Sequence, residues 1–222
     1  MPLDNKRIRA ILFDIDGTLS DSDDQMVSQV SRWLRPLGWL IGAQRLRPLA
    51  RRLVMGFESP ANFLYALLDN LGLDRWFMGG FSRKPSSKAH PHNYWIIPGV
   101  PEMLAQLHTR YALGVVSARN EETTLAFLRQ FDLGNYFGVV VTSQACRRTK
   151  PHPEPVRFAA QRLKVKPEQC LMVGDTTVDM LAGKRAGAQT LGVLCGFGTR
   201  SELLRSGADE IINTTVEIVQ LL

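Results

Sequence analysis

The sequence has few cysteines and no long apolar run. Cys146, Cys170 and Cys195 lie far apart without a C-x-x-C pair, so neither a disulfide framework nor a zinc site is predicted. We expect them to be small buried hydrophobic residues in a reducing compartment. No stretch approaches the roughly 18 apolar residues of a membrane span, and the first apolar run, Ala10 to Phe13, is too short for a signal peptide. These absences favour a soluble cytoplasmic protein without a membrane partner.

Common cofactor motifs are missing as well. The sequence contains no G-x-G-x-x-G, Walker A or H-E-x-x-H pattern, and its four histidines show no metal-ligand spacing. The 222 residues suffice for one large domain, or for a core domain with a smaller insert. The net charge of +6 suits anionic small molecules, nucleic acid or an acidic surface, and a solvated basic surface is the simpler interpretation.

Apolar strands and helices alternate through most of the chain. The first strand is expected at residues 8–14. After Pro98-Gly99 we expect helices at 100–110, 121–131, 153–163, 177–186, 200–205 and 215–221, and strands at 112–117, 138–142, 170–174, 189–194 and 209–212. This alternation predicts an α/β fold, a doubly wound Rossmann-like parallel sheet with helices on both faces.

The segment between the first expected strand and Pro98-Gly99 has a different pattern. Helical patterns are expected at 22–35, 43–55 and 59–70, and residues 79–93 read as a linker. We therefore predict a catalytic core at 1–20 and 95–222 and an all-helical cap inserted at 21–94. The cap is basic, with six arginines and two tryptophans between residues 31 and 57; this fits a lid that attracts phosphate, a nucleic-acid or membrane surface, or a solvated helix face. No recognised nucleic-acid motif accompanies these residues.

Two acids follow the first strand. Asp14 and Asp16 are two residues apart, which in a strand places them on one side, and Gly17 then lets the chain turn. Two carboxylates in an apolar context need a cation to offset their charge. We assign Asp14 as the nucleophile of phosphoryl transfer and Asp16 as the general acid and base.

Polar residues also follow three other strands, and ligands bind at the carboxyl ends of such strands. The Ser117 hydroxyl, with backbone N–H groups at the next helix start, fits phosphoryl oxygens. Ala118 and Arg119 follow it and are counted with the phosphate-binding residues, and Arg119 could reach a substrate anion. Lys150 is a point charge able to neutralise Asp14 and phosphate together.

After the fourth expected strand, the sequence places two more acids, Asp175 and Asp179. They are four residues apart and share one face if they open a helix. Together with Asp14 they suit Mg²⁺, which prefers oxygen ligands.

Each residue also has a plain structural interpretation. Taken alone, Ser117 and Asp175 read as helix caps, Asp179 as a surface acid, and Lys150 and Arg119 as surface residues. Their occurrence in order, each after its own strand, favours an active centre.

At these residues the sequence resembles the haloacid dehalogenase-like hydrolases. Asp14-Ile15-Asp16-Gly17-Thr18-Leu19 is similar to the first motif of that superfamily, Ser117 to the second, Lys150-Pro151 to the third, and Gly174-Asp175 through Asp179 to the fourth. Residues 186–198 are similar to its phosphoglycolate phosphatase-like branch. The resemblance implies a Mg²⁺ ion bound by the Asp14 carboxylate, the Asp16 main-chain carbonyl and Asp175, with Asp179 in support.

The expected function is therefore a Mg²⁺-dependent phosphatase that acts on a small phosphorylated metabolite through an aspartyl-phosphate. A phosphomutase of the same superfamily is one alternative. A non-catalytic regulatory protein that binds nucleic acid or a partner through the basic cap is another. The sequence identifies neither the substrate nor the oligomeric state.

Overall fold

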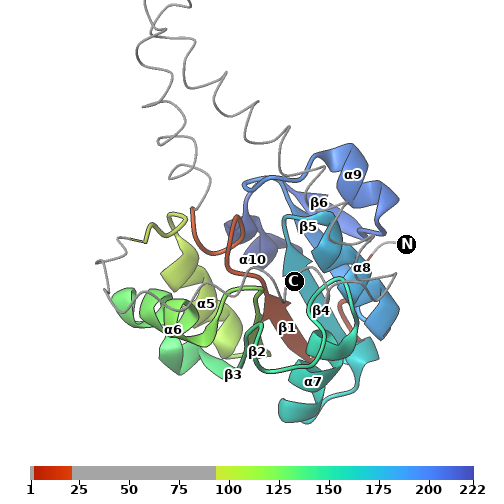
Figure 1. Cartoon of the computed structure of the whole chain (residues 1–222). Coiled ribbons are helices and arrows are strands. Elements are labelled where there is room, and N and C mark those ends of the chain that lie inside the picture. The colour runs from red at the N-terminus through yellow and green to blue at the C-terminus, as the bar shows by residue number, and fades with distance from the viewer. Residues whose placement is uncertain (1–2, 22–93) are drawn as a thin grey trace, which may run out of the picture. The chain divides into compact units, whose positions relative to one another are not determined.

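The computed structural model describes residues 3–21 and 94–222. Of these, residues 3–21 and 95–222 belong to one compact unit. Its centre is a sheet of parallel strands in the order β3-β2-β1-β4-β5-β6 (Figure 1). The strands are β1 (Ala10–Phe13), β2 (Ala112–Val116), β3 (Phe137–Val141), β4 (Cys170–Gly174), β5 (Gln189–Val193) and β6 (Glu210–Ile212). The predicted doubly wound α/β core is confirmed.

Helices cover both faces of this sheet (Figure 1). They are α5 (Val100–His108), α6 (Glu121–Gln130), α7 (Glu154–Arg162), α8 (Thr177–Ala186), α9 (Arg200–Arg205) and α10 (Ile218–Leu221). The chain moves outward from β1 to β3 and then outward in the opposite direction from β4 to β6. Because such crossovers are right-handed, α5 and α6 lie on one face and α7 and α8 on the other.

The core explains why these segments fold as they do. The four residues of β1 are all buried, since a central parallel strand has a helix layer on each side. On one face Ala10 and Leu12 pack with Met172 of β4 and with small residues of the helices, such as Ala159 of α7 and Ala182 of α8. None of the described helices is long and apolar enough to cross a membrane.

The reversal of direction has a functional consequence. β1 pairs with β2 on one side and with β4 on the other, so the chain switches direction between β1 and β4. Crevices at the carboxyl ends of strands at such a switch point are where ligands bind in doubly wound sheets. The residues that follow β1 and β4 therefore lie where a site is expected.

Two chain segments bordering the predicted insert pair with each other. Ser20 and Ile96 form an antiparallel bridge, and the Ile97 N–H donates to the Leu19 carbonyl at 3.0 Å. The Ser20 hydroxyl also donates to the Trp95 carbonyl at 3.0 Å. The predicted cap and its three helices lie outside the described residues, so those predictions and the domain boundaries stay predictions.

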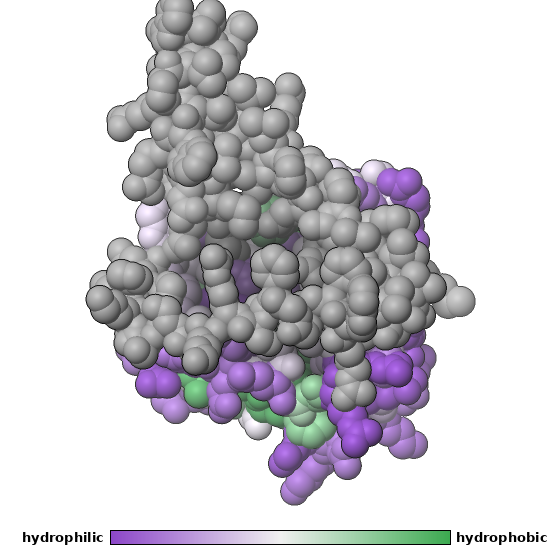
Figure 2. All heavy atoms as spheres, viewed as in Figure 1, coloured by the Kyte–Doolittle hydropathy of each residue, from purple (hydrophilic) through white to green (hydrophobic). Residues whose placement is uncertain are grey.

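The surface of the described part is mostly hydrophilic on the face shown in Figure 2, with smaller hydrophobic patches. Among the described residues, the exposed large hydrophobic side chains are Trp95 and Leu204. All three cysteines are free thiols, and Cys170 is buried as expected. Cys146 and Cys195 are only partly buried, which corrects the prediction for those two residues.

Candidate active site

Three of the predicted residues lie directly past the ends of strands. Asp14 follows β1, Ser117 follows β2 and Asp175 follows β4. The Asp14 N–H donates to the Val173 carbonyl at 3.0 Å, and the Ser117 N–H donates to the Val141 carbonyl at 2.9 Å. These bonds continue the sheet by one residue, so neighbouring strands fix the backbone at both positions.

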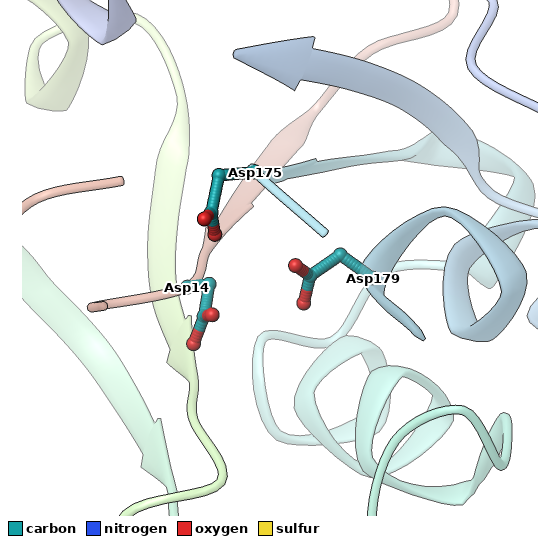
Figure 3. A group of neighbouring side chains, drawn as sticks. All are labelled: Asp14, Asp175 and Asp179. Carbon is teal, nitrogen blue, oxygen red and sulfur yellow. The ribbon is translucent and has the colours of Figure 1, made fainter. Parts of the chain in front are cut away.

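Three carboxylates meet at this edge of the sheet. Asp14, Asp175 and Asp179 are buried, and each offers an oxygen that lies within 4.8 Å of the others (Figure 3). Asp175 precedes α8 instead of lying in its first turn as the sequence suggested, while Asp179 lies inside that turn. The set is made of oxygen donors only, which is the chemistry that Mg²⁺ prefers.

Lys150 lies between two of these acids. Its Nζ atom is 2.9 Å from Asp14 Oδ1 and 2.6 Å from Asp179 Oδ1, and its side chain is only 3% exposed. The interpretation of Lys150 as a surface residue is therefore wrong. Burial disfavours the charged ammonium, but the carboxylates of Asp14 and Asp179 raise the pKa of Lys150, so it is a cation.

Asp14 is the most perturbed acid of the site. Burial, opposed by the charge of Lys150 and reinforced by the charges of Asp179 and Asp16, raises the pKa of Asp14 to about 7. A nucleophile must be in its carboxylate form. A further cation beside Asp14 would favour that form at neutral pH.

Asp175 is held in a tight cradle. Its Oδ2 atom accepts from the Phe197 N–H at 2.9 Å, and its Oδ1 atom accepts from the Thr18 hydroxyl at 3.4 Å. A Cβ atom on Gly196 would lie 2.1 Å from Oδ2, and one on Gly17, whose φ is +66°, would lie 2.3 Å from it. Neither glycine can carry a side chain while the carboxylate stays in place.

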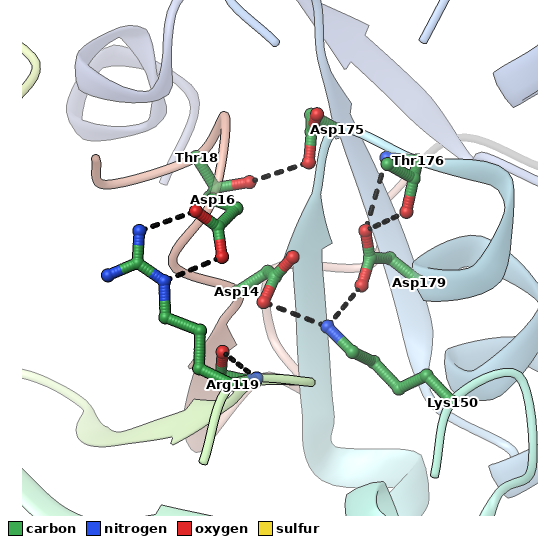
Figure 4. A network of polar contacts seen from close by, with 9 residues as sticks. Asp14, Asp16, Thr18, Arg119, Lys150, Asp175, Thr176 and Asp179 are labelled. Atoms are coloured by element: carbon green, nitrogen blue, oxygen red, sulfur yellow. Dashed lines mark hydrogen bonds and ion pairs between the residues drawn. The ribbon is translucent and has the colours of Figure 1, made fainter. Parts of the chain in front are cut away.

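Asp179 uses both of its oxygens. Oδ1 contacts Lys150, and Oδ2 accepts from the Thr176 N–H at 3.1 Å and from the Thr176 hydroxyl at 2.6 Å (Figure 4). Asp179 is therefore placed to hold the ammonium of Lys150 in position. Thr176 was not among the predicted residues, although the spacing Thr176-x-x-Asp179 at a helix start is the signal of a capping box.

Arg119 is paired with Asp16. Its Nε atom donates to Asp16 Oδ2 at 2.7 Å and its Nη2 atom to Asp16 Oδ1 at 2.5 Å (Figure 4). The Arg119 side chain is 15% exposed, so its interpretation as a surface arginine is wrong. The Arg119 N–H also donates to Ser117 Oγ at 3.1 Å, which leaves the proton of that hydroxyl to be donated elsewhere. Ala118, between them, is exposed.

Known proteins resemble this chain over most of its length. A family model described as haloacid dehalogenase-like hydrolase matches residues 11–193. The chain is 29% identical over 231 residues to a phosphoglycolate phosphatase of Nitrosococcus oceani, with 98% of this chain and 97% of the relative covered. It is 33% identical over 191 residues to the pyrophosphatase PpaX of Bacillus velezensis, covering 85% of this chain and 84% of the relative.

Solved structures show the same fold. A haloacid dehalogenase-like hydrolase from Streptococcus pneumoniae matches with a TM-score of 0.65 and 22% identity, over 97% of this chain and 99% of that one. At this identity the likeness concerns the fold alone.

Proposed function

This chain belongs to the haloacid dehalogenase-like hydrolase family, and we propose that it is a Mg²⁺-dependent phosphatase that hydrolyses small phosphate esters through an aspartyl-phosphate on Asp14. The observation that carries the proposal is Asp14 itself. It is a buried carboxylate at the end of the central strand, 2.9 Å from a buried ammonium and grouped with two further acids. A purely structural role would not require several acids grouped at one edge of the sheet.

The proposed reaction has two steps. Asp14 attacks phosphorus, the bond to the leaving oxygen breaks, and Asp16 gives that oxygen a proton. Water then attacks the phosphorus of the aspartyl-phosphate while Asp16 takes its proton. This step releases inorganic phosphate and restores the Asp14 carboxylate.

The residues around Asp14 supply the charge stabilisation that phosphoryl transfer needs. Lys150 lies against Asp14 and offsets negative charge on the transferred group. Ser117 donates its hydroxyl proton and the backbone N–H of Ala118 is a further donor, while the Arg119 N–H is engaged by Ser117 Oγ. The side chain of Arg119 is engaged by Asp16 instead.

The donor set fits Mg²⁺. Asp14 and Asp175 would hold the ion with their carboxylates and Asp16 with its main-chain carbonyl, while the contacts of Asp179 with Lys150 and Thr176 favour a supporting role. When bound, Mg²⁺ supplies positive charge that orients the phosphoryl group and favours the carboxylate form of its ligands.

The substrate class follows from the relatives. Those named above are a phosphoglycolate phosphatase and a pyrophosphatase, so we propose a small phosphorylated metabolite of that kind as substrate. The predicted cap at 21–94 would select it, and a cytoplasmic location stays a prediction.

The proposal is tested by phosphate release from p-nitrophenyl phosphate and a panel of phosphate esters. Release should require MgCl₂, stop in EDTA and be absent in Asp14→Asn. If no ester in the panel is hydrolysed by the folded wild-type protein with Mg²⁺, the phosphatase proposal fails. Turnover that needs a bisphosphate activator would favour the phosphomutase alternative instead.

A further inference from the structure

We propose that the Arg119 side chain recognises a second anionic group of the substrate, and that Asp16 occupies this anion site until the substrate arrives. The inference rests on the proposed phosphatase function and narrows its substrate class. The preferred substrates would be phosphate esters or anhydrides that carry a carboxylate or a second phosphate near the bond that is cleaved.

Arg119 is fixed by contacts on several sides. Its main-chain carbonyl accepts from the Ser143 N–H at 3.0 Å, and its N–H donates to Ser117 Oγ. Its guanidinium carbon lies 5.6 Å from the ring centroid of Phe127, which is fully buried in α6. A guanidinium stacked on a fixed ring loses little freedom when it binds a ligand, because most of its freedom is already lost.

The donors of Arg119 are arranged for a planar anion. Two N–H groups bind the two oxygens of one carboxylate at 2.7 and 2.5 Å, and this fork fits carboxylates and phosphates alike. The carboxylate that holds the fork now belongs to Asp16, a residue of the chain itself. An anionic group of a substrate presents the same pair of oxygens.

The two cations of the site differ in depth and in place. The Lys150 side chain is 3% exposed and contacts Asp14, whereas the pair of Arg119 and Asp16 is 15% and 38% exposed. Figure 4 shows Lys150 and Arg119 on opposite sides of Asp14. Lys150 therefore serves the phosphoryl group at Asp14, and Arg119 serves a different group on the more open side.

The ion pair between Arg119 and Asp16 is incompatible with the proposed role of Asp16 as general acid and base. Both carboxylate oxygens are bound by Arg119, so neither is available to approach the leaving oxygen. A partly exposed ion pair contributes little to folding stability, so stability alone does not explain it. An anionic group that replaces Asp16 on Arg119 would release Asp16 at the moment the substrate is bound.

The test compares three substrates in MgCl₂: phosphoglycolate, pyrophosphate, and ethyl phosphate, which has no second anionic group. Wild type should have the higher kcat/KM for one or both of the first two. In Arg119→Gln this preference over ethyl phosphate should fall about 10- to 100-fold, the effect of losing a charge-assisted pair. The kcat/KM for ethyl phosphate should change less than the values for the two doubly anionic substrates, because ethyl phosphate offers Arg119 no second anionic group.

Two controls accompany this variant. Arg129→Gln makes the same change on the exposed end of α6 and should leave all three values unchanged. Arg119→Lys keeps the charge but not the fork, so it should lose most of the preference. A loss of the preference for phosphoglycolate alone would identify the second group as a carboxylate, and a loss for pyrophosphate alone would identify it as a phosphate. An equal fall for all three substrates would overturn the inference.

A binding measurement separates this inference from the proposed function. Asp16→Asn removes the internal carboxylate. Calorimetry in MgCl₂, with Asp14→Asn added to every protein including wild type so that no ligand is hydrolysed, gives the Kd for phosphoglycolate, pyrophosphate and ethyl phosphate. The Kd for ethyl phosphate divided by the Kd for phosphoglycolate or pyrophosphate should be larger in Asp16→Asn than in wild type. Adding Arg119→Gln to Asp16→Asn should remove this increase in the ratio. A ratio that stays the same in all three proteins would overturn the inference even if the enzyme is a phosphatase.

Discussion

Replacing Lys150 by methionine is expected to destabilise the fold strongly when no divalent cation is present. The ammonium lies 2.9 Å from Asp14 Oδ1 and 2.6 Å from Asp179 Oδ1, and the side chain is 3% exposed. Methionine keeps the apolar part of the side chain but leaves two buried carboxylates facing each other. Removing one partner of a buried ion pair costs about 3–5 kcal/mol, so we expect a loss of that size in the free energy of unfolding at pH 8.

The loss of unfolding free energy in the methionine variant should be larger at high pH than at low pH. The pKa of Asp14 is about 7 in the folded protein, far above its ordinary value of 3.8, so the folded state loses stability as the pH rises from 3.8 to about 7 and no more above that. Without Lys150, which opposes that shift, the pKa of Asp14 rises further. At pH 5 the carboxyl group of the variant is then protonated, so the loss should be smaller at pH 5 than at pH 8.

The measurement is urea unfolding followed by circular dichroism at both pH values, in EDTA. The matched control is Lys184→Met: Lys184 lies 2.5 Å from Asp209 Oδ1, but its side chain is 40% exposed. Asp209 also accepts from the Thr190 N–H at 2.9 Å, so it keeps a partner in the control. Because Lys184 is in contact with solvent and Asp209 keeps this other partner, we expect a smaller loss than for Lys150→Met. Equal losses for the two variants at pH 8 would refute the assignment of Lys150 as the cation that holds the site together.

Three further predictions concern the metal. Mg²⁺ competes with a proton for Asp14, whose pKa is about 7, so the apparent Kd for Mg²⁺ should rise roughly tenfold per unit as the pH falls below 7, as measured by calorimetry. Gly196→Ala places a Cβ atom 2.1 Å from Asp175 Oδ2 and should weaken Mg²⁺ binding, whereas Gly134→Ala, with nothing within 4 Å, should leave it unchanged. Asp175→Asn should raise the Kd for Mg²⁺ more than Asp179→Asn, for which we expect about 10-fold; the reverse order would make Asp179 the direct ligand.

The sequence predicts the sheet well because its strands are buried on both faces. Cys170–Gly174 is a continuous apolar run that ends in glycine. The first and last residues of β4 and of α8 are the ones that the sequence predicted. The end of the chain agrees less well. The helix expected at 215–221 begins as a 3₁₀ turn, Thr215–Glu217, before α10. Periodicity does not distinguish the two kinds of helix over so few residues.

For the candidate site too, the sequence predicts some of the residue placements and not others. Asp14, Ser117 and Asp175 could be placed together because the ends of parallel strands converge whatever the side chains do. The pairing of Arg119 with Asp16 could not be predicted, since it depends on a ring of α6 and on loops that are far apart in sequence. Chain order alone leaves Arg119 indistinguishable from a surface residue.

The charges of the described site also argue for an order of events. Four carboxylates, on Asp14, Asp16, Asp175 and Asp179, face two cations, on Lys150 and Arg119. A phosphate ester adds further negative charge, and a second anionic group adds still more. A divalent cation offsets the excess of two negative charges in the site itself, so the metal should bind before the substrate does. Since burial raises the pKa of Asp14, the metal-free site balances part of this charge with a proton instead, and a protonated Asp14 is no nucleophile. The same burial that makes Asp14 reactive toward phosphorus therefore makes its activity depend on a cation.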